Sequence, residues 1–194
     1  MRNNIEKLTG YIEKLLSEKE RVIVAIDGNC GSGKTTIARA VSEHFSCPVI
    51  RTDDFFLRPE QRTEERLSEV GGNIDYERFK EEVTASLGKG VDFYYTPYDC
   101  GRGSLGEKIP VKMERVIIVE GSYSLHPCFE KYYDFSAFIT AEKTIIHNRL
   151  RKRNERLFSR FINEWIPKEN AYFEAFSEAE KADVIIDTTE SGAL

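Results

Sequence analysis

The sequence predicts an α/β protein in which a parallel sheet lies between two layers of helices. Short runs that are apolar throughout recur along the chain, and such runs are typical of strands buried on both faces. Segments with helical spacing of apolar residues separate these runs, and strands that alternate with helices form parallel sheets. At 194 residues without an evident linker, we expect a single domain over residues 1–194.

The two kinds of segment follow one another in order. Apolar, partly β-branched runs typical of buried strands occupy residues 21–26, 47–52, 115–120, 135–140 and 182–187. Helical patterns occupy residues 4–19 (within a leading amphipathic segment, 1–20), 34–45, 76–87, 142–158 and 161–181. We interpret the aromatic residues of the last helix as packing residues. Together the segments predict a five-stranded parallel sheet covered by helices.

Residues 91–113 predict a small β-hairpin. Its arms are "DFYYTPY" and "EKIPVKM", joined by a glycine-rich turn. Gly101, Gly103 and Gly106 in this turn match G-x-G-x-x-G, the fingerprint of dinucleotide-binding proteins. That fingerprint requires a helix to begin there, whereas Pro110 and alternating apolar residues follow. We therefore reject a dinucleotide site.

Composition excludes several classes of protein. The formal net charge of -5 argues against a dedicated nucleic-acid binder. No run approaches the ~18 apolar residues of a membrane span, and the first residues lack the apolar core and cleavage site of a signal peptide. We therefore expect a cytoplasmic protein without a membrane partner. The four cysteines are too scattered for a zinc site or a disulfide framework, although oxidation of Cys30 could affect ligand binding.

The strongest functional signal is the run "GNCGSGKTT", which follows a predicted strand and opens a predicted helix. It matches G-x-x-x-x-G-K-[ST], the phosphate-binding loop, or P-loop. Its glycines let backbone N–H groups surround phosphate oxygens, Lys34 would reach the β and γ phosphates, and the Thr35 hydroxyl would bind Mg²⁺. The nucleotide-binding candidates are Gly28, Asn29, Cys30, Gly31, Ser32, Gly33, Lys34, Thr35 and Thr36.

The absence of GTPase motifs from the sequence excludes one class of nucleotide-using protein. The chain contains neither the N-K-x-D nor the D-x-x-G motif of GTPases, so we expect ATP as the nucleotide. ATP-driven machines and small-molecule kinases remain, and a single domain of this length favours a kinase.

A kinase needs a carboxylate that takes the proton of the acceptor hydroxyl. Asp53 and Asp54 follow the second predicted strand, where one of them would activate the hydroxyl and the other would face away or bind Mg²⁺. Glu120 ends the third predicted strand and is a candidate Mg²⁺-organising carboxylate. Solvent-exposed turn residues are the structural alternative for all three.

A basic segment, residues 149–160, contains a cluster of arginines and one lysine. A helix face exposed to solvent is the ordinary explanation. In a kinase, such a segment would form a mobile lid that neutralises the transferring phosphoryl group and excludes water. Arg149 and Arg153 are the catalytic candidates, and which arginine acts stays open.

These motifs, in this order, resemble the uridine kinase and phosphoribulokinase group of P-loop kinases over residues 21–187. The resemblance rests on "GNCGSGKTT", "TDDFF", "GGNIDYERF", "TPYDC", "VIIVEG" and "ADVII". It implies the three-layer P-loop NTPase fold with strand order 2-3-1-4-5. It also implies that Asp53 is the general base and that Glu120 organises Mg²⁺.

For the acceptor, the resemblance implies that Asp75 binds ribose hydroxyls and that Tyr98 lines or stacks on the base. The family usually continues after its tyrosine–aspartate pair with a phenylalanine and a pyrimidine-reading histidine and arginine. This chain has "CGRGS" instead, in which Arg102 is a further candidate for binding the acceptor.

The resulting hypothesis is an ATP- and Mg²⁺-dependent kinase acting on a small hydroxyl compound, first of all the 5′-hydroxyl of a nucleoside. Other riboside acceptors such as nicotinamide riboside, pantothenate and phosphoribulose-like sugar phosphates are alternatives. An ATP-binding regulatory protein is an alternative of another class, and a nucleic-acid-stimulated ATPase is disfavoured by the charge. A homo-oligomer is compatible with the sequence.

Overall fold

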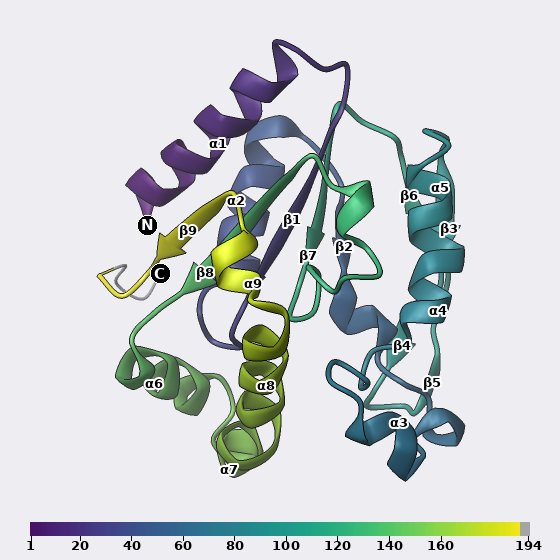
Figure 1. Ribbon diagram of the computed structural model, residues 1–194, viewed down its shortest axis with the longest axis vertical. Coiled ribbons are helices and arrows are strands. Elements are labelled where there is room, and N and C mark those ends of the chain that lie inside the picture. The colour runs from purple at the N-terminus through teal and green to yellow at the C-terminus, as the bar shows by residue number, and fades with distance from the viewer. Residues whose placement is uncertain (191–194) are drawn as a thin grey trace.

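A five-stranded parallel sheet organises the protein, whose computed structural model describes residues 1–190 (Figure 1). Its strands are β1 (Val22–Gly28), β2 (Val49–Arg51), β7 (Val116–Glu120), β8 (Phe135–Thr140) and β9 (Val184–Asp187). They lie in the order β2-β7-β1-β8-β9, and every neighbouring pair is parallel. Counting only these strands along the chain, the order is 2-3-1-4-5, so the predicted α/β fold and strand order are confirmed.

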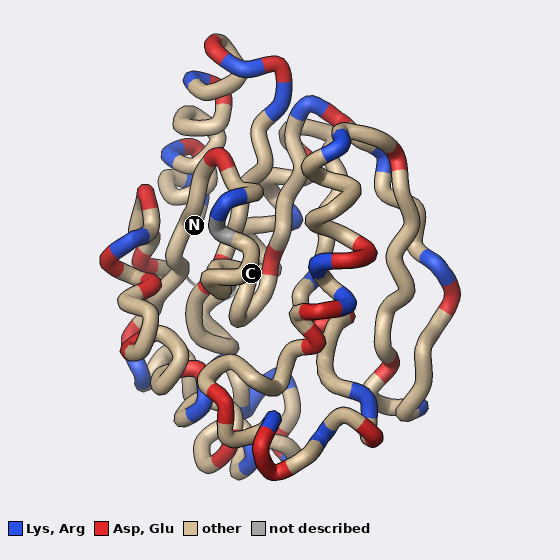
Figure 2. The backbone as a smooth tube through the Cα atoms, turned by 45° about the vertical axis from the view of Figure 1, so that its right-hand side comes forward, with Lys and Arg blue, Asp and Glu red and all other residues tan. Residues whose placement is uncertain are grey.

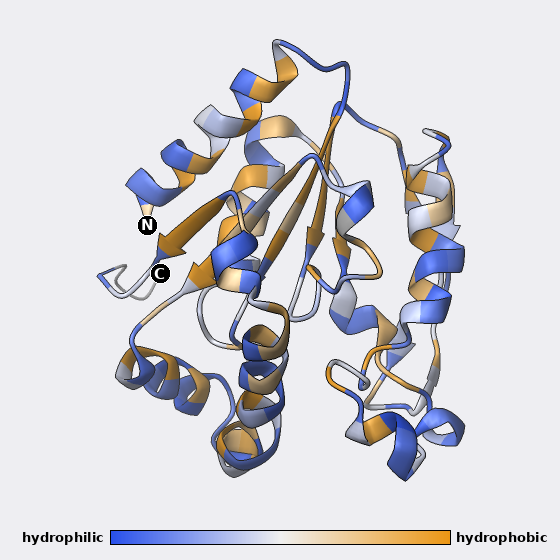
Figure 3. Cartoon of the chain, viewed as in Figure 1, coloured by the Kyte–Doolittle hydropathy of each residue, from blue (hydrophilic) through white to orange (hydrophobic). Residues whose placement is uncertain are grey.

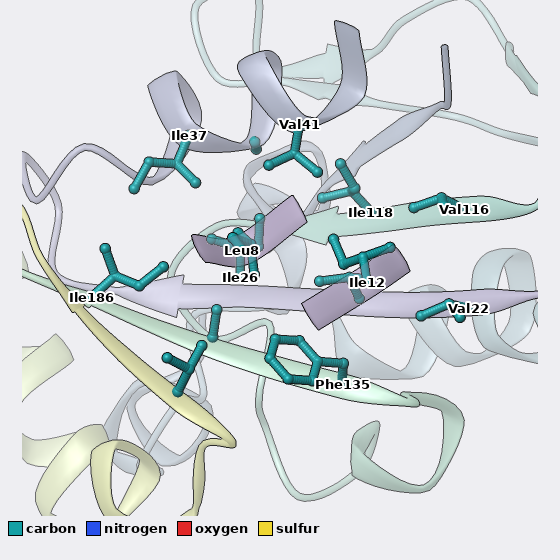
Figure 4. Packing of buried hydrophobic residues seen from close by; sticks show 14 of the residues in the cluster. Leu8, Ile12, Val22, Ile26, Ile37, Val41, Val116, Ile118, Phe135 and Ile186 are labelled. Carbon is teal, nitrogen blue, oxygen red and sulfur yellow. The ribbon is translucent and has the colours of Figure 1, made fainter. Parts of the chain in front are cut away.

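Helices cover both faces of the sheet. On one face, α1 (Arg2–Leu16) and α2 (Lys34–Phe45) contribute Leu8, Ile12 and Ile37 to a core with strand residues such as Ile26 (Figure 4). Figure 3 shows that the strands are the most continuously hydrophobic part of the chain. Strand residues of the opposite face pack with α4 (Tyr76–Phe79) and α8 (Ile166–Phe176) in a second core. The central strands β1 and β7 are mostly apolar because both faces of the sheet are buried there.

Two of the predicted helices are interrupted. The expected helix over 142–158 ends as α6 (Lys143–Arg153), because Asn154 is extended and its side chain accepts the N–H of Leu157. A 3₁₀ turn, Glu155–Leu157, then leads into α7 (Phe158–Arg160). The expected helix over 161–181 begins with a π-helical turn, Phe161–Trp165, continues as α8 and is broken at Ser177 (φ 52°) before α9 (Glu178–Lys181).

The segment after β2 holds the other short elements. A 3₁₀ turn, Thr52–Phe55, comes first, followed by another, Pro59–Gln61, and by α3 (Glu64–Ser68). The predicted helix over 76–87 is present as α4, a π-helical turn (Lys80–Thr84) and α5 (Ala85–Leu87). A further 3₁₀ turn, Glu130–Tyr132, precedes β8.

The predicted hairpin is also present. β3 (Phe93–Tyr95) pairs antiparallel with β6 (Ile109–Val111), and β4 (Tyr98–Asp99) pairs with β5 (Ser104–Leu105) across the turn. No helix begins at the glycines of residues 101–106, where the structure has a turn and β5. The rejection of a dinucleotide site is therefore consistent with the fold.

Basic and acidic residues are interspersed along the backbone in Figure 2, without a face of one sign in that view. No helix within residues 1–190 is long and apolar enough to cross a membrane. The P-loop, Asp53 and Glu120 lie at the carboxyl ends of β1, β2 and β7, whereas the other functional candidates lie on helices and on the hairpin. Figure 1 shows α6, α7 and α8 on one side of this edge and α3 with the β4–β5 turn on the other.

Candidate active site

The P-loop joins the end of β1 to the start of α2, as the sequence predicts. Gly28 has φ +135°, and a Cβ there would lie 2.0 Å from the carbonyl oxygen of Ile139 in the neighbouring strand. Gly33 has φ +104° and directly precedes α2. Only glycine takes up such backbone angles without strain. The loop therefore turns sharply enough to direct backbone N–H groups and a helix N-terminus toward one place, the arrangement that binds phosphate.

Lys34 lies beneath the loop and is 7% exposed. Its Nζ donates to the carbonyl oxygens of Gly28 (2.7 Å) and Asn29 (3.0 Å) and makes a longer contact, 3.3 Å, with the Ser122 hydroxyl. The Lys34 ammonium is thus held by the same loop that is expected to bind the phosphates of the nucleotide.

The two predicted Mg²⁺ residues lie in contact. The Thr35 hydroxyl donates to Oε1 of Glu120 at 3.0 Å. They meet because Glu120 ends β7 beside Ile26 of β1, from which the P-loop starts. Burial raises the pKa of the Glu120 carboxyl, and the Lys34 charge opposes that rise. A hydroxyl and a carboxylate suit Mg²⁺, which keeps several waters and binds through few protein ligands.

No cluster of three metal-ligating side chains occurs within residues 1–190. Thr35 and Glu120 stay the residues predicted to hold Mg²⁺, together with the phosphates of the nucleotide.

Asp53 and Asp54 follow β2, and the structure gives them different surroundings. Asp53 is half-exposed, lies 3.8 Å from the Arg51 guanidinium and interacts electrostatically with Glu120. Asp54 is more buried, and its Oδ2 accepts the Tyr95 hydroxyl at 2.9 Å. Burial raises the pKa of Asp54. Because Asp54 is hydrogen-bonded to Tyr95 of the hairpin, Asp53 is the carboxylate more available to an acceptor hydroxyl.

Asp75 caps α4 and is 1% exposed. Its Oδ1 accepts the N–H of Arg78 at 3.1 Å, and its Oδ2 accepts the Gln61 amide at 2.9 Å. The guanidinium groups of Arg58 and Arg78 lie 3.9 and 3.5 Å from Oδ2. Binding of ribose hydroxyls by Asp75 stays a prediction, and it requires an exchange of these partners.

The remaining acceptor candidates lie on the hairpin. Tyr98 in β4 is 5% exposed, and the guanidinium carbon of Arg62 is 6.0 Å from its ring centroid. Arg102 lies in the turn, pairs with Asp99 at 3.4 Å and has 81% of its side chain exposed. Arg62 therefore stands beside the ring expected to line the acceptor, whereas Arg102 extends into solvent.

The two arginines predicted for a lid lie in α6 but have different surroundings. One guanidinium nitrogen of Arg149 donates to Thr188 Oγ1 at 2.9 Å and to the carbonyl oxygens of Gly31 and Ser32 at 3.3 and 3.2 Å, and the other donates to the Thr188 carbonyl at 2.8 Å. Arg149 thus ties the P-loop to the chain after β9, and burial lowers its pKa. Arg153 ends α6 and is exposed.

Asp27 is a site residue that the sequence analysis missed. It is fully buried and accepts the backbone N–H groups of Gly28 (2.7 Å), Tyr123 (3.2 Å) and Leu125 (2.9 Å), together with the Tyr172 hydroxyl (3.1 Å). Burial raises the pKa of Asp27 to about 7. An acidic residue inside an apolar strand, directly before the loop, was the available signal. Tyr172, expected only to pack, is buried but also donates this hydrogen bond.

Glu169, Ser122 and Asn170 also contact the P-loop or its lysine and were not anticipated. The Cys30 N–H donates to Glu169 at 2.9 Å, and the Asn29 amide donates to Asn170 at 2.9 Å. Nothing in the local sequence marks these residues, because α8 reaches the loop only through the fold. Burial also raises the pKa of the Cys30 thiol well above its usual range, which disfavours the thiolate that oxidation requires.

No protein-family model matches the chain, and no curated protein matches it as a relative. Solved structures do resemble it. A Bacillus stearothermophilus protein described as a possible uridine kinase is 22% identical, with a TM-score of 0.72 over 96% of this chain and 98% of that one. A candidate fructose transport system kinase from Silicibacter sp. TM1040 is 20% identical, with a TM-score of 0.66 over 92% of this chain and 98% of that one.

A third similar structure is a candidate P-loop-containing kinase with a circular permutation, from Saccharomyces cerevisiae. It is 13% identical, with a TM-score of 0.63 over 94% of this chain and 98% of its own. The TM-scores show a shared architecture, whereas such low identities leave the activity to be argued from the site. The chain therefore has the α/β fold of the P-loop kinases over nearly its whole described length.

Proposed function

We propose that the protein is an ATP-dependent kinase that transfers the terminal phosphoryl group to a hydroxyl of a small molecule, with a nucleoside or another riboside as the first acceptor to test. The observation that carries the proposal is the placement of the P-loop, the Thr35–Glu120 pair and Asp53 at the ends of adjacent strands. Phosphate binding, metal binding and proton removal are thus available at one place, as phosphoryl transfer requires.

In this mechanism the P-loop amides and Lys34 bind the phosphates. Thr35 and Glu120 would hold Mg²⁺, which when bound would neutralise charge on the phosphates. Asp53 accepts the proton of the acceptor hydroxyl, because it is half-exposed, whereas Asp54 accepts the hydroxyl of Tyr95. Asp75 and Tyr98 would orient the acceptor so that its hydroxyl faces the terminal phosphate.

The two lid arginines take different parts in the proposal. Arg149 holds the loop through its contacts with the carbonyls of Gly31 and Ser32, so it is a positioning residue. Arg153 is the arginine proposed to close over the transferring phosphoryl group, because it is exposed at the end of α6, just before the helix is interrupted at Asn154. Positive charge brought there would stabilise the charge that spreads over the phosphoryl oxygens.

A second candidate function, phosphorylation of an anionic acceptor such as a sugar phosphate or pantothenate, is favoured by the arginines beside the acceptor residues. Arg62 stands over the Tyr98 ring and forms no ion pair within residues 1–190. Arg58 lies 3.6 Å from Glu60 and 3.9 Å from Asp75. Guanidinium groups bind phosphate and carboxylate well.

A mass-spectrometric screen with Mg²⁺ and ATP tests both candidates. The panel pairs nucleosides and nicotinamide riboside with anionic acceptors such as ribulose 5-phosphate and pantothenate, and each anionic compound is accompanied by its neutral analogue. We expect one acceptor to gain a phosphate with the wild type and none with Asp53→Asn. Phosphorylation of only the anionic member of a pair would select the second candidate.

ATP binding without phosphorylation of any acceptor would instead support the regulatory alternative, a protein that has kept the P-loop for ligand sensing. Failure to bind ATP would overturn the proposal altogether. Nucleotide binding is therefore measured in parallel, by calorimetry on the same preparation.

A further inference from the structure

Glu169 is a buried carboxylate to which the proposed reaction gives no role. It lies in α8 and is 5% exposed. None of the ion pairs among residues 1–190 includes it. Burying a charge without a cation is unfavourable for folding unless hydrogen bonds compensate. The groups that donate hydrogen bonds to Glu169 therefore indicate its function.

Both oxygens of Glu169 reach the phosphate site. Oε2 accepts the backbone N–H of Cys30, inside the P-loop, at 2.9 Å, and Oε1 accepts the Ser122 hydroxyl at 2.7 Å. The next residue of α8, Asn170, accepts the side-chain amide of Asn29 at 2.9 Å. Consecutive residues of the helix that follows the lid thus hold the first half of the P-loop.

Ser122 connects the carboxylate to the lysine of the loop. The Ser122 hydroxyl has one proton, and the shorter of its two donor contacts is with Glu169, at 2.7 Å against 3.2 Å to the carbonyl oxygen of Gly28. Donation to Glu169 leaves the hydroxyl lone pairs to accept from Lys34, whose Nζ lies 3.3 Å away. The direction of this hydrogen bond therefore presents an acceptor to the ammonium group.

We propose that Glu169 is a positioning residue of the phosphate site. It orients Lys34 through Ser122, and its negative charge weakens the binding of ATP more than the binding of ADP. The inference rests on the proposed function, because it requires that the loop bind ATP. Lys34 is the group that reaches the β and γ phosphates, and Glu169 is one hydroxyl away from it. Like charges repel strongly in a partly buried site. The additional phosphate of ATP is therefore disfavoured by Glu169 more than the phosphates of ADP are.

The experiment compares dissociation constants for ATP and ADP, both with Mg²⁺, by isothermal titration calorimetry. Glu169→Gln removes the charge at nearly constant size. Glu174→Gln is the matched control, since Glu174 is exposed on the same helix. We expect the ratio of the ADP constant to the ATP constant to rise about tenfold in Glu169→Gln, equivalent to about 1.4 kcal/mol. The ratio should stay at the wild-type value in Glu174→Gln.

Ser122→Ala provides a second variant that keeps the carboxylate and removes its link to Lys34. We expect affinity for both nucleotides to fall about threefold to tenfold, without the rise in the ratio seen for Glu169→Gln. This variant decides the proposal if Glu169→Gln does not fold, which its thermal melting would reveal. Unchanged affinities in Ser122→Ala would then overturn it.

A merely structural carboxylate gives a different result. Glu169→Gln would lower the melting temperature and leave the ratio of the two constants unchanged, and that result overturns the inference alone. A wild-type protein that binds neither nucleotide would overturn the proposed function. The calorimetry thus separates the two failures.

Discussion

At the scale of single residues, the site separates two neighbouring aspartates that the sequence presents as alternatives. Asp54 accepts the Tyr95 hydroxyl, whereas Asp53 stays half-exposed near Glu120. The distinction comes from the 3₁₀ turn after β2, which directs adjacent side chains to different sides. One carboxylate therefore supports the hairpin and the other is available for chemistry.

Asp53→Asn should lower kcat by about 10²–10⁴, because the amide cannot accept the acceptor proton. The dissociation constant for Mg²⁺ and ATP should change less than about threefold, since the phosphates are held elsewhere. Single-turnover phosphorylation and calorimetry measure the two quantities. A variant as active as the wild type would remove Asp53 from the proposed role.

Gly28→Ala should destabilise the fold, because the added Cβ would lie 2.0 Å from the Ile139 carbonyl oxygen and the backbone is at φ +135°. We expect a loss of at least about 2 kcal/mol in the free energy of unfolding. Gly10→Ala is the matched control, since nothing lies within 4 Å of a Cβ in that helical position. It should stabilise the protein by about 0.5–1 kcal/mol. Urea denaturation measures both changes, and equal effects would contradict the steric argument.

At the scale of elements, α6 carries both arginines predicted for a lid, and its packing gives them different surroundings. Leu150 of α6 lies against the loop, where a Cβ on Gly31 would be 3.0 Å from its Cγ. Arg149, one residue earlier, donates to the carbonyls of the same loop. The helix therefore packs against the P-loop through Arg149 and Leu150, whereas Arg153 at its end is exposed.

Arg149→Ala should lower both the free energy of unfolding, by about 1.5–3 kcal/mol, and the affinity for ATP, because charged hydrogen bonds to the P-loop and Thr188 are lost. Arg153→Ala should leave the free energy of unfolding within about 0.5 kcal/mol of the wild type. It should instead reduce kcat by about 10²–10³. Thermal unfolding together with kinetics checks the division. If Arg149→Ala mainly lowered kcat and Arg153→Ala mainly lowered stability, the roles proposed for the two arginines would be exchanged.

At the scale of the whole molecule, buried carboxyl groups make the stability of the fold depend on pH. Burial raises the pKa of Asp27 to about 7 and also raises those of Asp54 and Glu120. Between the unfolded and folded pKa values, the folded state holds a proton that the unfolded state has released. Stability from these groups is thus present at low pH and decreases as pH rises.

The stability that Asp27 contributes should therefore fall as pH rises from about 4 to about 7, while His126, whose pKa burial lowers, contributes in the opposite direction. Over this range the free energy of unfolding should therefore have a different slope in Asp27→Asn, shifted toward rising stability. Urea denaturation across this pH range measures the slope. Glu174→Gln, an exposed change in α8, serves as control. A slope identical in Asp27→Asn and the wild type would exclude Asp27 as its origin.

Local patterns were sufficient for much of the molecule because they follow from short-range chemistry. The P-loop signature, the apolar strands and the proline that prevents a helix after Gly106 act within a few residues of themselves. The predicted helix over 34–45 is present with those bounds. The breaks at Asn154 and Ser177 were missed because a cap and a left-handed turn, chosen by packing, outweigh helical spacing there.

The sequence by itself indicated the sheet, the P-loop with Lys34 and Thr35, Glu120, and the pair of aspartates after β2 from which the proposal takes its base. Each of them lies at a strand end or helix start, and parallel strands bring such ends to one edge of the sheet. Only the tertiary structure decided which aspartate is available, that Arg149 holds the P-loop, and that Glu169 reaches Cys30 across 139 positions of sequence. Those contacts join elements that are distant in the sequence. Whether such elements meet depends on how whole helices pack on the sheet, and no local sequence pattern encodes that packing.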